Sequence, residues 1–267
     1  MSDAPVGVFD SGVGGLTVVR AINRLLPAES VLYFGDTARL PYGSKSPETV
    51  IRFSLENALF LTEKNVKMVV AACNTASSVS LPVLRETLGV PVLGVILPGA
   101  EMAASVTENG RVGVIGTHGT ISSGAYQKAL ADLGVRAVSA QPAPLLVPMV
   151  EEGWLDHPIT EAIILEYTGP LLREGIDTLV LGCTHYPLLK PLFRKVLGGG
   201  VHLVDSAEAA ALKVREILDE NGLRRDGTSG DNRFYVSDIP LKFQEIAQRF
   251  LGRAVPLVTQ IQVGRYD

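Results

Sequence analysis

Two cysteines stand out, because a thiol is one of the few side chains that can both give and take a proton near neutral pH. Cys73 and Cys183 are the two cysteines of the 267-residue chain, and each follows a short apolar run and precedes hydroxyl or amide side chains. An ordinary thiol, with a pKa of ~8.5, is a weak base. The N-terminus of a helix stabilises the thiolate. We expect such helices to begin at Asn74–Thr75 and at Thr184, which would equip both thiols for acid–base chemistry.

Three more polar side chains are placed where they could assist the thiols. Asp10 ends an apolar run, and the Ser-Gly-Val-Gly-Gly segment after it can bend tightly and expose N–H groups. His185 lies two residues after Cys183 and could hold or relay its proton. Glu151 closes an apolar run and either lines a cleft or ends a solvated helix. Structural roles for Asp10, as a helix cap, and for His185 remain the alternatives.

Other kinds of site fit the sequence less well. The glycine loop after Asp10, with Asp36 about 20 residues later, suggests a dinucleotide site. However, Thr17 replaces the last glycine of that motif, and the Asp10 carboxylate would repel a pyrophosphate. Cys183 and His185 lack further ligands at metal-binding spacing, so we expect no metal. No lysine is placed to form a Schiff base, so we expect no pyridoxal cofactor.

The elements that must position these residues follow an α/β pattern. Short β-branched runs alternate with segments of helical periodicity, which is typical of buried parallel strands between helices. Ser46-Pro47-Glu48 is a typical helix start, and a long helix is expected from Ser206. The expected strands lie at 6–10, 31–35, 68–72, 92–96, 112–115, 178–181, 201–204 and 234–236, with a helix and a last strand after them.

The chain also repeats itself. Residues 6–12 resemble 112–118 and residues 69–75 resemble 179–185, so that Cys73 corresponds to Cys183. All strand–helix units look alike to some degree, and a single cysteine in such a unit would suggest core packing. Two cysteines at matched positions favour a shared function. Because ligands bind at the carboxyl ends of parallel strands, the repeat predicts two similar parallel-sheet α/β domains, related by a pseudo-two-fold, with both thiols facing a cleft between them.

Composition narrows the choice of partners. The chain is 46% hydrophobic and 19% charged and carries a net charge of −4, so the basic surface of a nucleic-acid-binding protein is missing. Its apolar stretches are broken by Pro and Gly and fall short of the ~20 residues that span a bilayer. The start at 1–5 lacks the basic region of a secretory signal. We expect a cytoplasmic protein with no nucleic-acid or membrane partner.

These motifs together resemble those of the cofactor-independent aspartate/glutamate racemase family. The similar segments cover nearly the whole chain, at 9–17, 33–38, 41–43, 72–76, 116–120, 147–153 and 182–187. The resemblance implies that Cys73 and Cys183 are the acid–base pair and that Asp10, Glu151 and His185 assist them. It also implies substrate contacts from Asp10, Ser11, Tyr42, Gly43, Asn74, Thr75, Thr117, Thr184 and His185.

The resemblance carries expectations for the protein as a whole. The Asp-Ser-Gly-Val-Gly-Gly and Pro-Tyr-Gly segments look like the glutamate branch, which implies a cofactor-free isomerase that supplies D-glutamate for peptidoglycan synthesis. One domain is expected to comprise residues 1–97 with 207–267, and the other residues 98–206; a homodimer is left open. A lyase or decarboxylase would need only one cysteine, and a solute-binding module would need no paired thiols.

Overall fold

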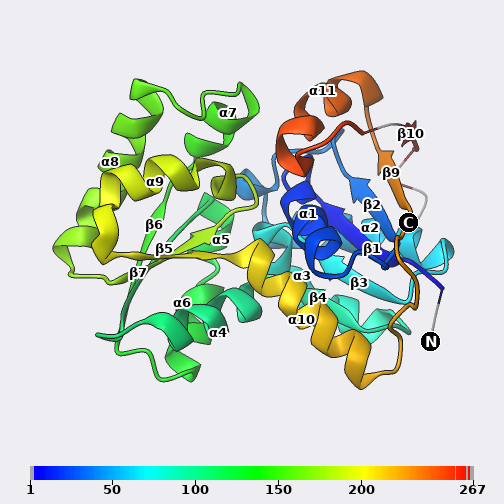
Figure 1. Ribbon diagram of the computed structural model, residues 1–267, viewed down its shortest axis with the longest axis horizontal. Helices are drawn as coiled ribbons and strands as arrows, with labels where there is room; N and C mark the ends of the chain where they lie inside the picture. The colour runs from blue at the N-terminus through cyan, green and yellow to red at the C-terminus, as the bar shows by residue number, and fades with distance from the viewer. Residues whose placement is uncertain (1–2, 256, 263, 265–267) are drawn as a thin grey trace.

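Two parallel β-sheets, each packed against helices, make up the protein (Figure 1). The computed structural model describes residues 3–255, 257–262 and 264. The first sheet has six strands in the order β10-β9-β2-β1-β3-β4, and the second has four in the order β6-β5-β7-β8. The strands of the first sheet are β1 (Val6–Asp10), β2 (Val31–Gly35), β3 (Met68–Ala71), β4 (Val92–Gly94), β9 (Asn232–Val236) and β10 (Val258–Gln260); those of the second are β5 (Arg111–Gly116), β6 (Ala137–Pro142), β7 (Thr178–Gly182) and β8 (His202–Asp205). The predicted α/β class, with two parallel sheets, is confirmed.

Helices connect the strands in both halves. They are α1 (Leu16–Leu25), α2 (Pro47–Glu63), α3 (Asn74–Thr87), α4 (Ile96–Val106), α5 (His118–Ser122), α6 (Ala125–Asp132), α7 (Leu146–Glu151), α8 (Pro158–Arg173), α9 (Lys190–Leu197), α10 (Ser206–Glu220) and α11 (Pro240–Leu251), with short 3-10 helices η1 (Tyr42–Ser44), η2 (Tyr186–Leu189) and η3 (Gly198–Gly200). At the start of α2 the Ser46 side chain accepts a hydrogen bond from the Thr49 amide and Pro47 is the first helical residue, as predicted.

The internal repeat is visible in the order of the strands. The run β2-β1-β3-β4 in the first sheet has the same connectivity as β6-β5-β7-β8 in the second. Cys73 therefore follows β3 and Cys183 follows β7, which are equivalent strands. In the C-terminal tail β9 pairs with β2 and β10 with β9, so the tail extends the first sheet.

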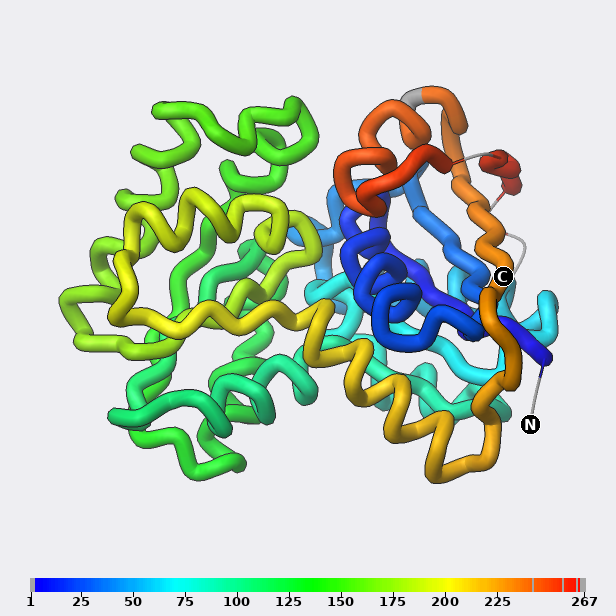
Figure 2. The backbone as a smooth tube through the Cα atoms, viewed as in Figure 1, coloured from blue at the N-terminus to red at the C-terminus, as the bar shows by residue number. Residues whose placement is uncertain are grey.

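Two segments connect the halves. The chain crosses to the second sheet at α4 and returns through α10, which packs against both α1 and α4 (Figure 2). One buried apolar cluster includes Val13 and Phe250 from the first half together with Ile115 and Cys183 from the second. Because the same cluster runs through both halves, the strand ends of each are held close to those of the other.

The sequence pattern missed or misplaced a few elements. Strand β6 was not predicted: its residues are all only partly buried, because it forms an edge of the second sheet. The expected strand at 92–96 ends at Gly94, and helix α4 begins at Ile96.

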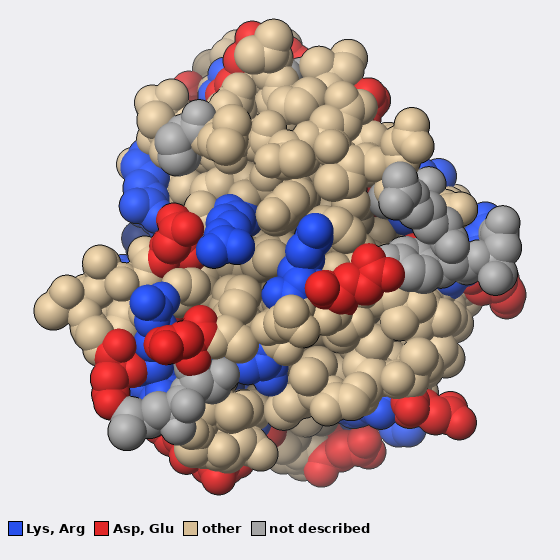
Figure 3. Space-filling model, turned by 90° about the vertical axis from the view of Figure 1, so that its right-hand side faces the viewer, with Lys and Arg blue, Asp and Glu red and all other residues tan. Residues whose placement is uncertain are grey.

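Two properties of the described residues bear on possible partners: the apolar length of the helices and the distribution of charged side chains. No helix among the described residues is both long and apolar enough to cross a bilayer. On the face drawn in Figure 3, acidic and basic side chains lie beside one another rather than in single-sign patches.

Candidate active site

A cavity of about 210 Å³ lies between the two sheets, at the carboxyl ends of their strands. Both cysteines line it, each with a small exposed fraction of 6–7%. Its lining comprises Ser11, Gly12, Leu40, Pro41, Tyr42, Gly43, Cys73, Asn74, Thr75, Thr117, Val147, Pro148, Glu151, Cys183, Thr184 and His185. The structure thus brings the predicted site residues together around one cavity, except that Asp10 is fully buried behind it.

Cys73 occupies the N-cap position of α3, where the helix start was predicted. Burial and the nearby charge of Asp10 raise the pKa of the Cys73 thiol to about 12, against the opposing effect of hydrogen bonds from the Ala76 amide and the Ser11 hydroxyl. Burial also raises the pKa of Asp10 itself, although the charge of His185 and the amide of Gly12 act against this. One Asp10 oxygen accepts the Gly12 amide at 3.0 Å; the other has no hydrogen-bond partner among the described residues. Cys73 is therefore a protonated thiol at neutral pH.

Cys183 has a different neighbour. Its sulfur lies 3.8 Å from Nδ1 of His185, and Nε2 of the same ring lies 3.0 Å from a carboxylate oxygen of Glu151. Burial lowers the pKa of His185, but its hydrogen bonds to Cys183 and Glu151 and their negative charges outweigh burial and raise that pKa to about 10. His185 thus connects the sulfur of Cys183 to the carboxylate of Glu151.

One prediction about Cys183 is wrong. No helix begins at Thr184; the chain turns, and the 3-10 helix η2 begins only at Tyr186, with α9 after it at Lys190. The two thiols therefore have different partners: a helix N-terminus and Asp10 for Cys73, and the His185–Glu151 pair for Cys183. The physical reason is local: the Tyr186 amide donates to the Cys183 carbonyl in a tight turn, and Pro187 has no N–H for the hydrogen bond that a helix continuing from Thr184 would need there.

The close packing between the halves is clearest at Gly14. A Cβ atom at this position would lie 2.1 Å from Oγ1 of Thr184 and 2.6 Å from Nδ1 of His185. The hydroxyl of Thr17, one turn further on, is within hydrogen-bonding distance of the Thr184 carbonyl, at 3.1 Å. Gly14 thus has no side chain because the turn that carries His185 occupies that space.

Hydroxyl and amide groups line the wall opposite this turn. Thr75, Thr117 and Thr120 form a triangle of hydroxyl contacts of 2.8–3.2 Å across the two halves. Oδ1 of Asn74 accepts a hydrogen bond from the Tyr126 hydroxyl at 2.8 Å, and the buried Nδ2 has no partner among the described residues. This amide is a donor available to a bound acid.

The hydroxyl of Tyr42 is used elsewhere. It donates to Asp36 and accepts from the Asn57 amide, although Tyr42 is one of the residues that line the cavity. A substrate contact at Tyr42, as the sequence predicted, would therefore come from its backbone or its ring. Asp36 accepts hydrogen bonds from Arg39, Tyr42 and Ser237.

Several lining residues were not singled out from the sequence. The apolar parts of the wall are formed by Leu40, Pro41, Val147 and Pro148. The last three lie inside the motifs at 41–43 and 147–153, so these motifs could have identified them. The buried ring of Phe250 stands edge-on to the His185 ring at 5.1 Å, and it comes from the C-terminal helix α11, which no local pattern connects to Cys183. No group of three His, Cys, Asp or Glu side chains among the described residues is arranged to hold a metal ion.

Comparisons with known proteins agree with this geometry. The Asp/Glu/Hydantoin racemase family model matches residues 6–214. The chain is 51% identical over 260 residues to a glutamate racemase of Geobacter metallireducens, covering 97% of this chain and 96% of the relative. Its fold matches crystal structures of a glutamate racemase from Bacillus anthracis (TM-score 0.93, 43% identity, 97% of both chains) and of one from Francisella tularensis in complex with D-glutamate (TM-score 0.92, 37% identity, 98% of both chains).

These matches extend over nearly the full length of the chain, and both sheets and both cysteine-bearing strand ends lie within the region that the relatives cover. The chain therefore belongs to the Asp/Glu/Hydantoin racemase family and is an isomerase.

Proposed function

We propose that the protein is a glutamate racemase that inverts the α-carbon of glutamate with Cys73 and Cys183 as a two-base pair. The observation that carries the proposal is the placement of two thiols at equivalent strand ends, both lining one cavity, each with its own polar partner. The relatives at about half identity over nearly the full chain carry the name glutamate racemase. In this role the protein would supply cytoplasmic D-glutamate for peptidoglycan.

The stereochemistry explains why two thiols are needed. To invert a carbon, a proton must leave one face and another must arrive on the opposite face. A thiolate at Cys183, beside the imidazolium of His185, takes the proton from one enantiomer. The Cys73 thiol, whose pKa is raised, delivers its proton to the other face of the carbanion. The other enantiomer reacts through the reverse sequence, and no cofactor takes part.

The groups that assist the two thiols can be assigned to one thiol each. We assign Asp10 to Cys73, because its buried carboxyl group raises the pKa of that thiol and keeps one oxygen without a partner among the described residues. We assign His185 and Glu151 to Cys183, because they form a continuous line of contacts to its sulfur. The two thiols thus have different assisting groups for the same kind of proton transfer.

Neutral donors would bind the two substrate carboxylates. The described residues that line the cavity include no lysine or arginine. The unpartnered Asn74 amide and the hydroxyls of Ser11, Thr75, Thr117 and Thr184 are the donors that face the space. Hydrogen bonds to a charged acceptor are strong, so these groups can hold a carboxylate without a lysine or arginine.

We also propose domain boundaries at 97/98 and 206/207, so that residues 1–97 with 207–267 form one domain and 98–206 the other. Strands β1–β4, β9 and β10 share one sheet, and β5–β8 share the other. Helices α4 and α10, which lead from one half to the other, begin at Ile96 and Ser206, beside these boundaries.

The test is racemisation of L-glutamate in heavy water by the purified protein, followed by circular dichroism. At low conversion, the D-glutamate formed should carry deuterium at Cα, because the donor thiol exchanges with solvent before it reacts. The remaining L-glutamate should keep its original hydrogen. Mass spectrometry of the separated enantiomers reads both. Absence of racemisation would contradict the function, and early deuterium in recovered L-glutamate would contradict two independent one-proton bases.

A further inference from the structure

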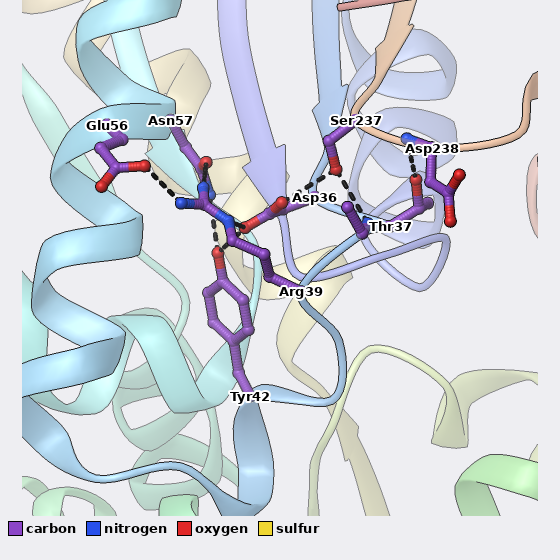
Figure 4. Close-up of polar contacts among 9 residues, drawn as sticks. Asp36, Thr37, Arg39, Tyr42, Glu56, Asn57, Ser237 and Asp238 are labelled. Carbon is purple, nitrogen blue, oxygen red and sulfur yellow. Dashed lines mark hydrogen bonds and ion pairs between the residues drawn. The ribbon is translucent and has the colours of Figure 1, made fainter. Parts of the chain in front are cut away.

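A polar network connects Tyr42, which lines the cavity, to Asp36, Arg39 and Asn57 (Figure 4). One wall of the cavity is formed by Leu40, Pro41, Tyr42 and Gly43. Arg39 reaches toward helix α2, and its side chain is only 16% exposed. Arg39 is absent from the cavity lining, so any effect it has on the substrate passes through the wall.

All three nitrogens of the Arg39 guanidinium have partners. Nε donates to Asp36 at 2.7 Å, Nη2 donates to the side-chain oxygen of Asn57 at 3.0 Å, and Nη1 donates to Glu56. The carboxylates of Asp36 and Glu56 are 0% and 8% exposed. A planar guanidinium with fixed N–H directions suits such a site, whereas a lysine ammonium would supply one point charge.

The contacts close into a ring. Asn57 accepts from Arg39 and donates its amide to the Tyr42 hydroxyl at 3.0 Å; that hydroxyl in turn donates to Asp36, which accepts from Arg39. The Asn57 amide donates to the Tyr42 hydroxyl, and that hydroxyl can then donate only to Asp36, so the donor directions around the ring are consistent with one another. Figure 4 shows the Tyr42 hydroxyl pointing into the ring. Tyr42 is therefore held at its outer end by the network while its inner side forms the cavity wall.

The network also fixes the base of the wall segment. The Ser237 hydroxyl donates to Asp36 at 2.9 Å and accepts the Ala38 amide at 2.9 Å. On the inner side, Gly43 packs so closely on Thr117 that a Cβ atom there would lie 2.7 Å from Cβ of that threonine. The wall is thus clamped between the network and the hydroxyl groups of the second half.

We propose that Arg39 is a positioning residue that closes this ring, fixes the wall at 40–43, and thereby sets the affinity for glutamate rather than the rate of proton transfer. The inference rests on the proposed racemase function. The two thiols come from other strand ends and lie outside this ring of hydrogen bonds, so the chemical step should proceed once the substrate is bound. A wall that the network no longer holds in place should therefore weaken substrate binding and raise KM.

The test compares Arg39→Ala with Arg52→Ala. Arg52 also places its guanidinium over the ring of Phe53, at 5.2 Å against 4.1 Å for Arg39, but it is exposed and takes no part in the ring of hydrogen bonds among the described residues. Since Arg39→Ala removes three hydrogen bonds of a charged group from the network that holds the wall, we expect it to raise KM for both enantiomers about tenfold or more. Its kcat should fall less than about threefold, and Arg52→Ala should change neither value more than about twofold.

Tyr42→Phe provides a gentler break. It removes one oxygen from the ring and keeps the aromatic side chain in the wall, so it should raise KM in the same direction, and it carries the test if Arg39→Ala does not fold. Merely structural damage would lower the active fraction, and hence kcat, at an unchanged KM. An unchanged KM in the folded variants, or the same rise in Arg52→Ala, would overturn the inference. Failure of the unmodified protein to racemise glutamate would overturn the proposed function and this inference with it.

Discussion

Replacing Gly14 with alanine should disable the Cys183 side of the site from a position that carries no functional group. The new Cβ would lie 2.1 Å from Oγ1 of Thr184 and 2.6 Å from two atoms of the His185 ring, where ordinary contacts begin near 3.4 Å. The turn must therefore move by about 1 Å, and a misplacement of that size typically costs ~10²-fold in rate. We expect kcat to fall about 10²-fold and stability to fall by about 1–3 kcal/mol, as for other overpacked sites.

The assay is racemisation of glutamate followed by circular dichroism, together with thermal unfolding of the same samples. Gly89→Ala is the matched control, because nothing among the described residues lies within 4 Å of its added Cβ; its kcat and stability should stay near those of the original protein. A folded Gly14→Ala protein with kcat within about threefold of the original would refute the reasoning, because the two halves could then not be packed as closely as the structure shows.

Three further predictions concern the side chains that line the cavity. Cys73→Ala and Cys183→Ala should each lower kcat by ~10²–10⁴-fold or more, and near-original turnover in either variant would argue against a two-base reaction. Because the pKa of His185 is raised from 6.5 to about 10, its charged form stabilises the fold fully below pH 6.5, and this contribution is lost as the pH rises through about 10. Melting temperatures of the original protein and of His185→Gln should therefore converge between pH 6.5 and 10, and a difference that grew over this range would contradict the assignment. Glutamate should be preferred over aspartate in kcat/KM, because a site built for a distant carboxylate leaves donors unpaired with the shorter acid; equal values for both acids would exclude such a site.

Local sequence patterns predicted most of the fold because the strands are buried on both faces. Strands β1, β2, β3 and β7 are buried at every residue, so each forms a short apolar run that needs no alternation to be recognised. The sequence pattern did not predict strand β6, because all its residues are only partly buried and its mixture of apolar and polar side chains shows no clear period. The helix expected at Thr184 does not form, because Pro187 has no N–H to donate and the chain makes a tight turn there, close to Gly14.

The groups to which we assign the chemistry were already predicted from the sequence. Two matched cysteines, with a histidine two residues after one of them, are local features, and the internal repeat alone predicts that both lie at equivalent strand ends. The neighbours of each thiol, in contrast, depend on the tertiary structure. Asp10 is 63 residues from Cys73, Glu151 is 34 residues from His185, and Arg39 acts through Asn57 on helix α2. Burial and charge–charge contact are properties of positions in space, so the shifted pKa values of Cys73 and His185 arise only when the two halves meet.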